Sequence, residues 1–259
     1  MDSLNEANKN QKTNNLDNLK KSFKSLKWYE WLMAIVMIGI AGISVYNAFT
    51  NPENSSNPPW LTIVNFISAI CGVICIFFCA KASISNYIFG LINTIVYVIF
   101  LVYHQIWGTF GLELLVYLPA NILGWIVWVK HRDTIDTEKT KAKKLTLKQN
   151  IIATVAVLVI AVICFYGLNI LNGKKPELTT LIILDAFTVS MGIVATILQY
   201  KRYREQYIWW LIQDIIAVGM YIVMFDPVYL TKKSIYLIMA VIGLYNWAKL
   251  QKTRNAENE

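Results

Sequence analysis

The sequence contains little charge and lacks the motifs that mark several classes of enzyme. Only 15% of its 259 residues are charged and 56% are hydrophobic, whereas about a quarter of the residues in soluble domains are charged. No Gly-rich phosphate-binding loop with its Lys is present, so the chain is not expected to hydrolyse nucleotides. Gly-x-Ser-x-Gly and His-Glu-x-x-His are also missing, and the two histidines, His104 and His131, fall at the edges of apolar runs. The sequence therefore does not favour an enzyme, and it indicates no cofactor.

Cysteine is scarce and does not form a metal-binding pattern. Cys71, Cys75 and Cys79 recur every four residues in one apolar run, and Cys164 lies in another. A stripe of thiolates could hold a soft metal, but neither His nor carboxylate accompanies it. Small apolar packing residues are the preferred interpretation, and no metal site is expected.

Long uncharged runs alternate with short segments that hold most of the Lys and Arg. A helix of about 20 apolar residues spans the hydrocarbon core of a bilayer, so the sequence predicts an all-α polytopic membrane protein. Eight membrane-spanning helices are expected, near residues 28–49, 60–80, 86–103, 109–129, 150–171, 180–200, 207–225 and 232–250. Residues 1–27 are rich in Asn and Lys and predict a disordered or loosely helical cytoplasmic tail.

Basic residues are divided unevenly between the two sides of these spans. If the N-terminus is cytoplasmic, 20 of the 24 Lys and Arg residues lie in inside segments. Only Lys174, Lys175, Lys232 and Lys233 then lie in outside loops. Basic residues concentrate in the cytoplasmic loops of membrane proteins, so both termini are expected in the cytoplasm. The net charge of +8 follows from the same rule and does not indicate a nucleic-acid partner.

The second half of the sequence repeats the first. The run Ser85-Asn-Tyr-Ile-Phe-Gly-Leu-Ile-Asn93 returns 120 positions later as Glu205-Gln-Tyr-Ile-Trp-Trp-Leu-Ile-Gln213, so Asn93 falls on Gln213. The same offset, or one residue less, relates three further pairs: Gly72 and Gly192, Lys81 and Lys201, and Gly124-x-x-x-Trp128 and Gly243-x-x-x-Trp247. The sequence therefore predicts two three-helix units.

The two units are expected to point the same way. They comprise residues 60–132 and 180–252, and the span 150–171 between them has no counterpart. This linker span adds one crossing of the membrane, which makes the two units parallel and relates them by a pseudo-two-fold axis along the membrane normal. The first span, 28–49, lies outside the repeat and is expected to be peripheral.

Several polar side chains lie inside the apolar spans, where each is costly unless it meets a partner. Asn93, Asn121 and Gln213 are deep amides, and Asp214 lies near the centre of its span. An interhelical hydrogen bond explains a single intramembrane amide about as well as a ligand site does. The repeat favours a shared ligand for Asn93 and Gln213, because they occupy equivalent positions. Asp214 is instead a candidate proton or cation site, which would imply coupled transport.

Large aromatic side chains form the second group of candidates. Such rings stack on planar ligands and attract cationic ones, although gap filling between helices accounts for each single ring equally well. Amides and rings together indicate a small, planar, hydrogen-bonding solute held near the midplane between the two units. The candidate substrate-binding residues are Asn93, Asn121, Gln213, Asp214, Tyr87, Trp125, Trp209, Trp210 and Tyr245.

Two sets of motifs resemble the bacterial nicotinamide riboside transporter family (PnuC). The first set is the run from Ser85 to Asn93, followed by Pro119-Ala-Asn-Ile-Leu-Gly-Trp125 and Trp128. The second is Trp209-Trp-Leu-Ile-Gln213 with Gly243-x-x-x-Trp247, and the similarity covers roughly residues 60–250. The resemblance implies a SWEET-like core of three, one and three helices, typically in a homotrimer, in the bacterial cytoplasmic (inner) membrane. It also implies that Asn93, Gln213, Trp209 and Trp210 line the ligand site.

The resemblance further implies facilitated uptake of nicotinamide riboside, which a cytoplasmic kinase then traps by phosphorylation. Gln213-Asp214 stands where some nicotinamide riboside members have Asn-Val, and related subfamilies carry thiamine, riboflavin or deoxynucleosides, so these solutes are alternatives. A hypothesis from another class is a membrane assembly subunit whose polar residues serve only helix packing. Binding of a small solute separates the two.

Overall fold

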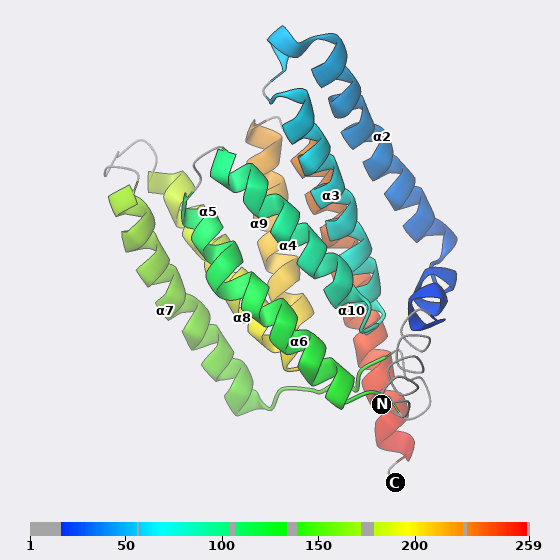
Figure 1. Cartoon of the computed structure of the whole chain (residues 1–259). Coiled ribbons are helices and arrows are strands. Elements are labelled where there is room, and N and C mark those ends of the chain that lie inside the picture. The colour runs from blue at the N-terminus through cyan, green and yellow to red at the C-terminus, as the bar shows by residue number, and fades with distance from the viewer. Residues whose placement is uncertain are drawn as a thin grey trace, which may run out of the picture.

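The protein is a bundle of long helices that run roughly side by side (Figure 1). The computed structural model describes residues 17–55, 57–103, 107–133, 139–171, 179–224 and 227–257. In chain order the helices are α2 (Trp28–Thr50), the short turn η1 (Pro52–Asn54), α3 (Pro59–Ala80), α4 (Asn86–Tyr103), α5 (Trp107–Leu112), the π-helical turn η2 (Glu113–Tyr117), α6 (Leu118–Lys130), α7 (Leu147–Leu171), α8 (Thr179–Tyr200), α9 (Gln206–Met224) and α10 (Pro227–Glu257). The all-α class expected from the sequence is confirmed.

Six of the described helical segments are long and apolar enough to cross a membrane: 28–50, 59–80, 86–103, 110–130, 147–170 and 182–200. Helices α9 and α10 are not among them. Gln213 and Asp214 lie in the middle of α9, and Lys232 and Lys233 lie near the start of α10. The coarse prediction of a polytopic helical membrane protein therefore stands on six apolar segments.

Helix α10 begins earlier than the sequence suggested. The expected span started at residue 232, whereas the helix starts at Pro227. Proline is well suited to the first helical position, because its fixed φ is helical and it has no N–H to leave unpaired. Lys232 and Lys233, assigned above to an outside loop, therefore lie on a helix, which corrects that assignment.

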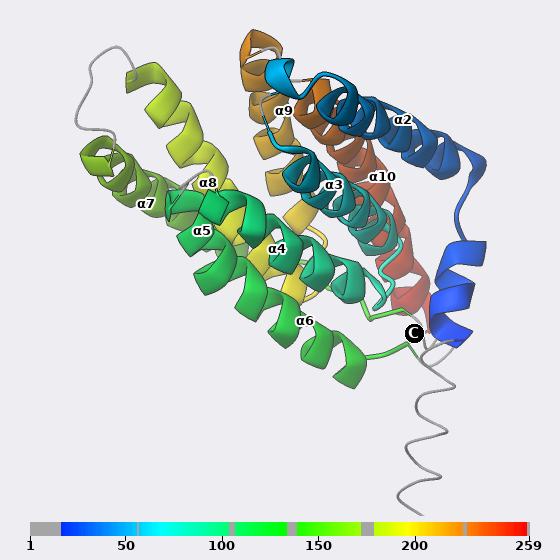
Figure 2. The same ribbon diagram turned by 45° about the horizontal axis from the view of Figure 1, so that its top comes forward.

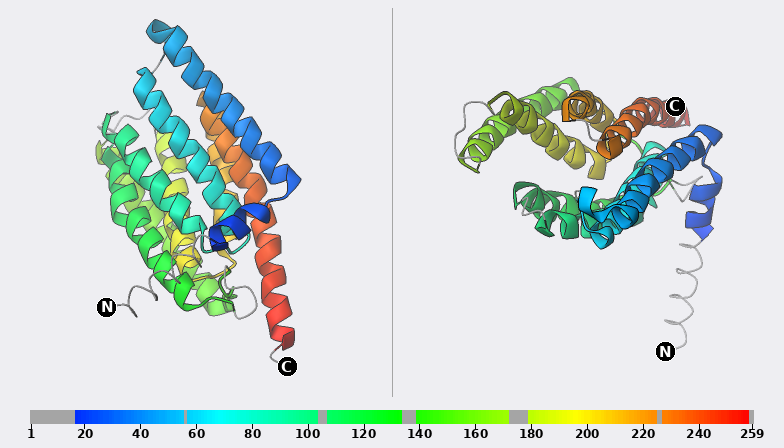
Figure 3. Two further views of the ribbon diagram at one scale, coloured as in Figure 1. Left: turned by 45° about the vertical axis from the view of Figure 1, so that its right-hand side comes forward. Right: turned by 90° about the horizontal axis from the view of Figure 1, so that it is seen from above.

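Helices α2 and α7 lie at opposite edges of the bundle (Figures 1 and 2). Seen from above, α7, α8, α9 and α10 form one curved row, and α2, α3, α4 and the α5–α6 segment form another (Figure 3). The rows meet where α10 packs against α3 and where α6 packs against α8. A space between the rows is thereby bordered by helices from both halves of the chain.

Helices α3 and α8 end with the same backbone motif. The N–H groups of Ser83 and Tyr203 donate to the carbonyl oxygens five residues back, both at 2.9 Å. Ala82 and Arg202, at φ 58° and 70°, adopt the left-handed conformation that this capping motif requires. Neither residue is Gly, so each turn costs about 1 kcal/mol that other contacts must offset.

The α6–α7 connection supplies some of those contacts. The Thr140 N–H donates to the Ala82 carbonyl at 3.0 Å, and the Lys143 N–H donates to the Arg202 carbonyl at 2.8 Å. One extended segment is therefore hydrogen-bonded to both turns. It also places Lys143 beside Arg202. Two effects lower the pKa of Lys143: partial burial, which is the larger, and repulsion from the Arg202 guanidinium.

Residues 17–24, which the sequence assigned to the tail, form a helix that packs against the turn after α3. The fully buried hydroxyl of Ser22 lies 2.9 Å from the Ser83 hydroxyl. The Phe23 ring meets Phe78 edge-on at 5.1 Å and Phe89 at 5.8 Å. The part of the tail before residue 17 lies outside the described residues.

Glu30, at the start of α2, is buried and paired. Its carboxylate accepts the Lys27 N–H at 2.6 Å and lies 2.7 Å from the Lys81 ammonium. Its side chain is 0% exposed and that of Lys81 is 11% exposed, so water cannot readily replace the Glu30 charge beside the Lys81 ammonium. This pair fixes α2 to the turn that follows α3.

We expect Glu30→Gln to lower the stability of the folded protein by about 3 kcal/mol, the typical cost of breaking one side of a buried ion pair. The measurement is the midpoint of thermal unfolding in detergent. Glu53→Gln is the matched control, because Glu53 is exposed on η1. An equal midpoint for the two variants would show that the Glu30–Lys81 pair contributes nothing.

Candidate functional site

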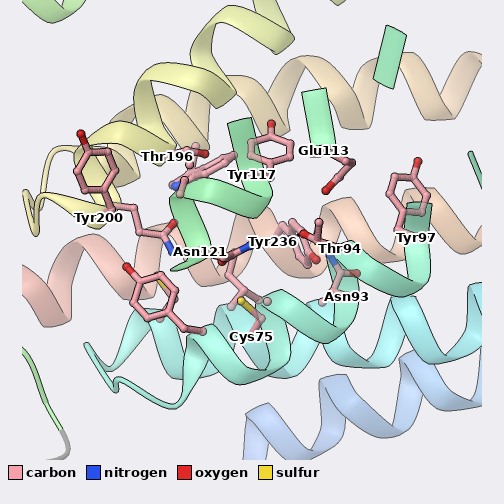
Figure 4. Close-up of a pocket in the computed structure, with 18 of the residues that line it drawn as sticks. Cys75, Asn93, Thr94, Tyr97, Glu113, Tyr117, Asn121, Thr196, Tyr200 and Tyr236 are labelled. Carbon is pink, nitrogen blue, oxygen red and sulfur yellow. Dashed lines mark hydrogen bonds between the residues drawn. The ribbon is translucent and has the colours of Figure 1, made fainter. Parts of the chain in front are cut away.

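A cavity of about 280 Å³ lies between the two rows of helices. Its wall is built by α3, α4, η2 with α6, α8, α9 and α10, so each half of the chain contributes three segments. The volume is near the lower end of the range for small-molecule sites, about 300–1,000 Å³. Figure 4 shows side chains from several helices directed into this space.

Asn93 on α4 and Gln213 on α9 both line the cavity, and each lies against a glycine. A Cβ on Gly72 would lie 3.2 Å from the Asn93 Oδ1, and a Cβ on Gly192 would lie 3.0 Å from the Gln213 Oε1. The glycines on α3 and α8 therefore make room for the two amides. Asn93 accepts a hydrogen bond from Ser68 at 3.0 Å, whereas the Oε1 of Gln213 is buried and finds no partner in the part of the chain that the structure describes.

The tyrosines next to these glycines come from the opposite row. The Tyr236 hydroxyl lies 2.5 Å from a Cβ built on Gly72, and the Tyr117 hydroxyl lies 2.7 Å from one built on Gly192. Tyr236 is on α10 and Tyr117 is on η2. Both tyrosines line the cavity beside the two amides.

Asn121 on α6 is the third amide of the wall. Its Nδ2 donates to the Thr94 hydroxyl at 3.5 Å, and its Oδ1 lies 2.7 Å from a Cβ built on Gly90. Gly90 therefore lets α4 approach α6 closely enough for this contact. The three amides present both donors and acceptors to a bound solute.

One end of the cavity is aromatic. Tyr87 and Tyr207 line it, are 1% exposed, and occupy the space that a side chain at Gly124 or Gly243 would need. Trp210 lies one turn further along α9 and also lines the wall. A planar ligand can stack here at little cost in hydration.

The other end of the cavity is charged. Glu113, on the π-helical turn, and Lys232 and Lys233, on α10, line it. Lys233 forms an ion pair with Asp214 at 2.9 Å, and Asp214 is 1% exposed. The Nζ of Lys232 lies 5.8 Å from the centre of the Tyr236 ring. Charges this deep in an apolar bundle are expensive and are commonly kept for function.

The structure brings five of the nine candidate residues to the cavity wall: Asn93, Asn121, Gln213, Tyr87 and Trp210. Asp214 reaches the cavity only through its ion pair with Lys233. Trp209 packs against the cluster around Leu198, and Trp125 packs against the cluster around Trp128. Tyr245 is 69% exposed on α10. The last three rings do not line the cavity, because the helical rotation that carries their neighbours inward turns them away.

The sequence analysis missed several polar residues of the wall, among them Lys232, Lys233, Tyr117 and Tyr236. The two lysines were placed in a loop because α10 was started too late. A signal for the tyrosines was present, because Tyr117 and Tyr236 are separated by 119 positions, as are Gly124 and Gly243. Within the described residues, no group of three or more His, Cys, Asp or Glu side chains is placed to hold a metal ion.

Comparison with known proteins identifies the family. The family model described as nicotinamide mononucleotide transporter matches residues 62–249, from α3 to α10. The crystal structure of the vitamin B3 transporter PnuC superposes with a TM-score of 0.70 and 30% identity, and the match covers 92% of this chain and 98% of that one. The chain belongs to the PnuC family of membrane transporters.

Two curated PnuC relatives support the assignment. The nicotinamide riboside transporter PnuC of Neisseria mucosa is 33% identical over 207 residues, which are 76% of this chain and 75% of the relative. That of Haemophilus influenzae is 31% identical over 202 residues, which are 76% of this chain and 82% of the relative. Because PnuC proteins are membrane transporters, this chain is a transporter and not an enzyme, and the hypothesis of a non-transporting assembly subunit is not supported.

Proposed function

We propose that the chain mediates facilitated uptake of nicotinamide riboside across the bacterial cytoplasmic membrane. The observation that carries this proposal is the cavity between the two rows, where Asn93, Gln213 and Trp210 lie together in a chain of the PnuC family. The curated relatives are named nicotinamide riboside transporters. A cytoplasmic kinase that phosphorylates the solute after entry would make uptake effectively one-way, since a charged phosphate no longer fits an apolar path.

We propose that eight membrane helices form this path, arranged as α2 and then three, one and three helices. The first unit is residues 60–132, the linker helix is α7, and the second unit is residues 180–252. Contacts that recur about 120 positions apart support the repeat. They include the capping turns at Ala82 and Arg202 and the paired glycines and amides at the cavity wall. The family model begins at residue 62, which agrees with a peripheral α2.

The π-helical turn accounts for the change of offset within the repeat. The offset is 120 for Asn93 and Gln213, before the turn, and 119 for Tyr117 and Tyr236, at its end. A π-helical turn takes up one residue more than an α-helical turn. One extra residue in η2 therefore keeps the two units in register, which supports their common origin.

We propose that both termini and the turns after α3 and α8 face the cytoplasm. The uneven distribution of Lys and Arg supports this orientation.

The rows are joined at this side by two tryptophans: Trp128 Nε1 donates to the Gln199 carbonyl at 3.0 Å, and Trp247 Nε1 donates to the Cys79 carbonyl at 2.9 Å. Rocking of the two units must break both bonds before the solute leaves on this side. A homotrimer, as the family resemblance implies, would cover part of the exposed apolar surface of α2 and α7.

Uptake into proteoliposomes tests this function. We expect radiolabelled nicotinamide riboside to equilibrate across the membrane without accumulating above the outside concentration, and an uncoupler to leave the rate unchanged, because Asp214 is neutralised by Lys233. Unlabelled nicotinamide riboside should compete, and thiamine should compete poorly. Preferential uptake of thiamine would replace the proposed substrate, and strong dependence on a pH gradient would make Asp214 a coupling site.

A further inference from the structure

We propose that Glu113 accepts hydrogen bonds from the hydroxyl groups of the ligand's sugar and thereby selects ribosides over deoxygenated ligands. This inference deepens the proposed function and rests on it. It concerns the charged end of the cavity. Glu113, at this end, is not one of the amide and aromatic residues that the sequence analysis proposed as the ligand site.

The Glu113 carboxylate is buried and only partly satisfied. The side chain is 6% exposed and lines the cavity, and its Oε2 is buried without a hydrogen-bond partner among the described residues. The Thr94 hydroxyl is its hydrogen-bonding neighbour. In Figure 4 Glu113 lies between Tyr117 and Tyr97 and is directed toward Thr94 and Asn93. A buried carboxylate oxygen without a donor is costly, so a ligand that supplies an O–H at this point gains affinity.

A second wall residue shows the same surplus of acceptors. The Oε1 of Gln213 is also buried without a donor among the described residues. A ligand that fits here must therefore donate more than one hydrogen bond. The vicinal diol of a ribose supplies two O–H groups on adjacent carbons, and a carboxylate is a recurrent partner for such hydroxyls in nucleotide-binding proteins.

The order of residues along the helices indicates the orientation in which a ligand fits the cavity. Along α9, Tyr207 and Trp210 precede Gln213 by two turns and one turn, and along α4, Tyr87 precedes Tyr97 in the same sense. The planar part of a nucleoside therefore fits the aromatic end, and its sugar points to Glu113. Lys232 carries the opposite charge and lines the same end of the cavity as Glu113, so the carboxylate acts as a local acceptor rather than as a general attractor of cations.

The test compares two ligands on two proteins by isothermal titration calorimetry in detergent. The ligands are nicotinamide riboside and its 2′-deoxy form, and the proteins are the wild type and Glu113→Gln, which keeps the size of the side chain. We expect the wild type to bind the riboside about 10- to 100-fold more tightly than the deoxy form, the usual effect of a hydrogen bond to a charged group. Glu113→Gln should lose most of this preference and bind the deoxy form as the wild type does. Glu53→Gln is the control at an exposed carboxylate.

Each other outcome overturns the assignment. A wild type that binds both forms equally, or a Glu113→Gln variant that keeps the preference, would exclude recognition of the hydroxyl by Glu113 while leaving nicotinamide riboside transport intact. Equal weakening of both ligands in the variant would show a structural role only. A wild type that binds thiamine, which has no sugar, and no riboside would overturn both this inference and the proposed function. If Glu113→Gln does not elute as a folded protein, Glu113→Asp, whose carboxylate is one methylene shorter, replaces it.

Discussion

Replacement of Gln213 by Ala is expected to weaken the binding of nicotinamide riboside by about 30-fold or more, the effect of losing a central, well-buried contact. Gln213 is 9% exposed and its Oε1 has no donor among the described residues, so a bound ligand is the partner that we expect to satisfy it. Gly192, on α8, leaves room for the Gln213 amide, which extends from α9. Removal of the side chain therefore takes a ligand contact away without breaking a hydrogen bond that the Oε1 makes among the described residues. The measurement is isothermal titration calorimetry on purified protein.

Asn93→Ala tests the other half of the amide pair. Asn93 accepts a hydrogen bond from Ser68, so this variant should lose both affinity and some stability, while Gln213→Ala should lose affinity alone. Asn47→Ala is the matched control, because Asn47 is exposed on α2. Normal binding by both Gln213→Ala and Asn93→Ala would show that the ligand does not use this cavity.

Replacement of Gly243 by Ala is expected to disrupt the packing of the bundle strongly. A Cβ at this position would overlap the ring of Tyr207, which is 1% exposed and packs edge-on against Trp247 at 5.8 Å. A ring that is buried and packed against Trp247 has little room to swing aside, so the two helices must move apart. Overpacking of this kind costs about 1–3 kcal/mol, and it also separates Trp247 from the Cys79 carbonyl that joins the rows.

Gly167→Ala is the matched control for this substitution. Gly167 also lies within a helix, α7, but outside the adjacent backbone of that helix no described atom lies within 4 Å of a Cβ built there. The expected result is a clearly lowered unfolding midpoint and lost uptake for Gly243→Ala, and an unchanged or slightly raised midpoint for Gly167→Ala, since Ala favours helix over Gly by up to about 1 kcal/mol. Similar behaviour of the two variants would show that the Tyr207 contact is not tight.

Part of this protein was determined by local sequence. Long uncharged runs have only one stable form in a bilayer, the helix, because every backbone N–H and C=O must be satisfied within the segment. The helices therefore follow the apolar runs to within a few residues, apart from α10, which starts five residues before the expected span 232–250 and ends seven residues after it. That Asn93 and Gln213 line one cavity could also be predicted, because the repeat in the sequence places them at equivalent positions.

Only the tertiary structure decided which side chains reach the cavity. Trp209 and Trp210 are adjacent in sequence, yet helical rotation turns one toward Leu198 and the other to the cavity. Tyr245 and Trp247 share a helix end, and one is exposed while the other is buried between the rows. The charged end was equally hidden. Glu113 depends on a π-helical turn, and Lys233 becomes neutralised only when α10 packs beside α9 and meets Asp214. Such contacts join residues far apart in the chain, and neither hydropathy nor periodicity encodes them.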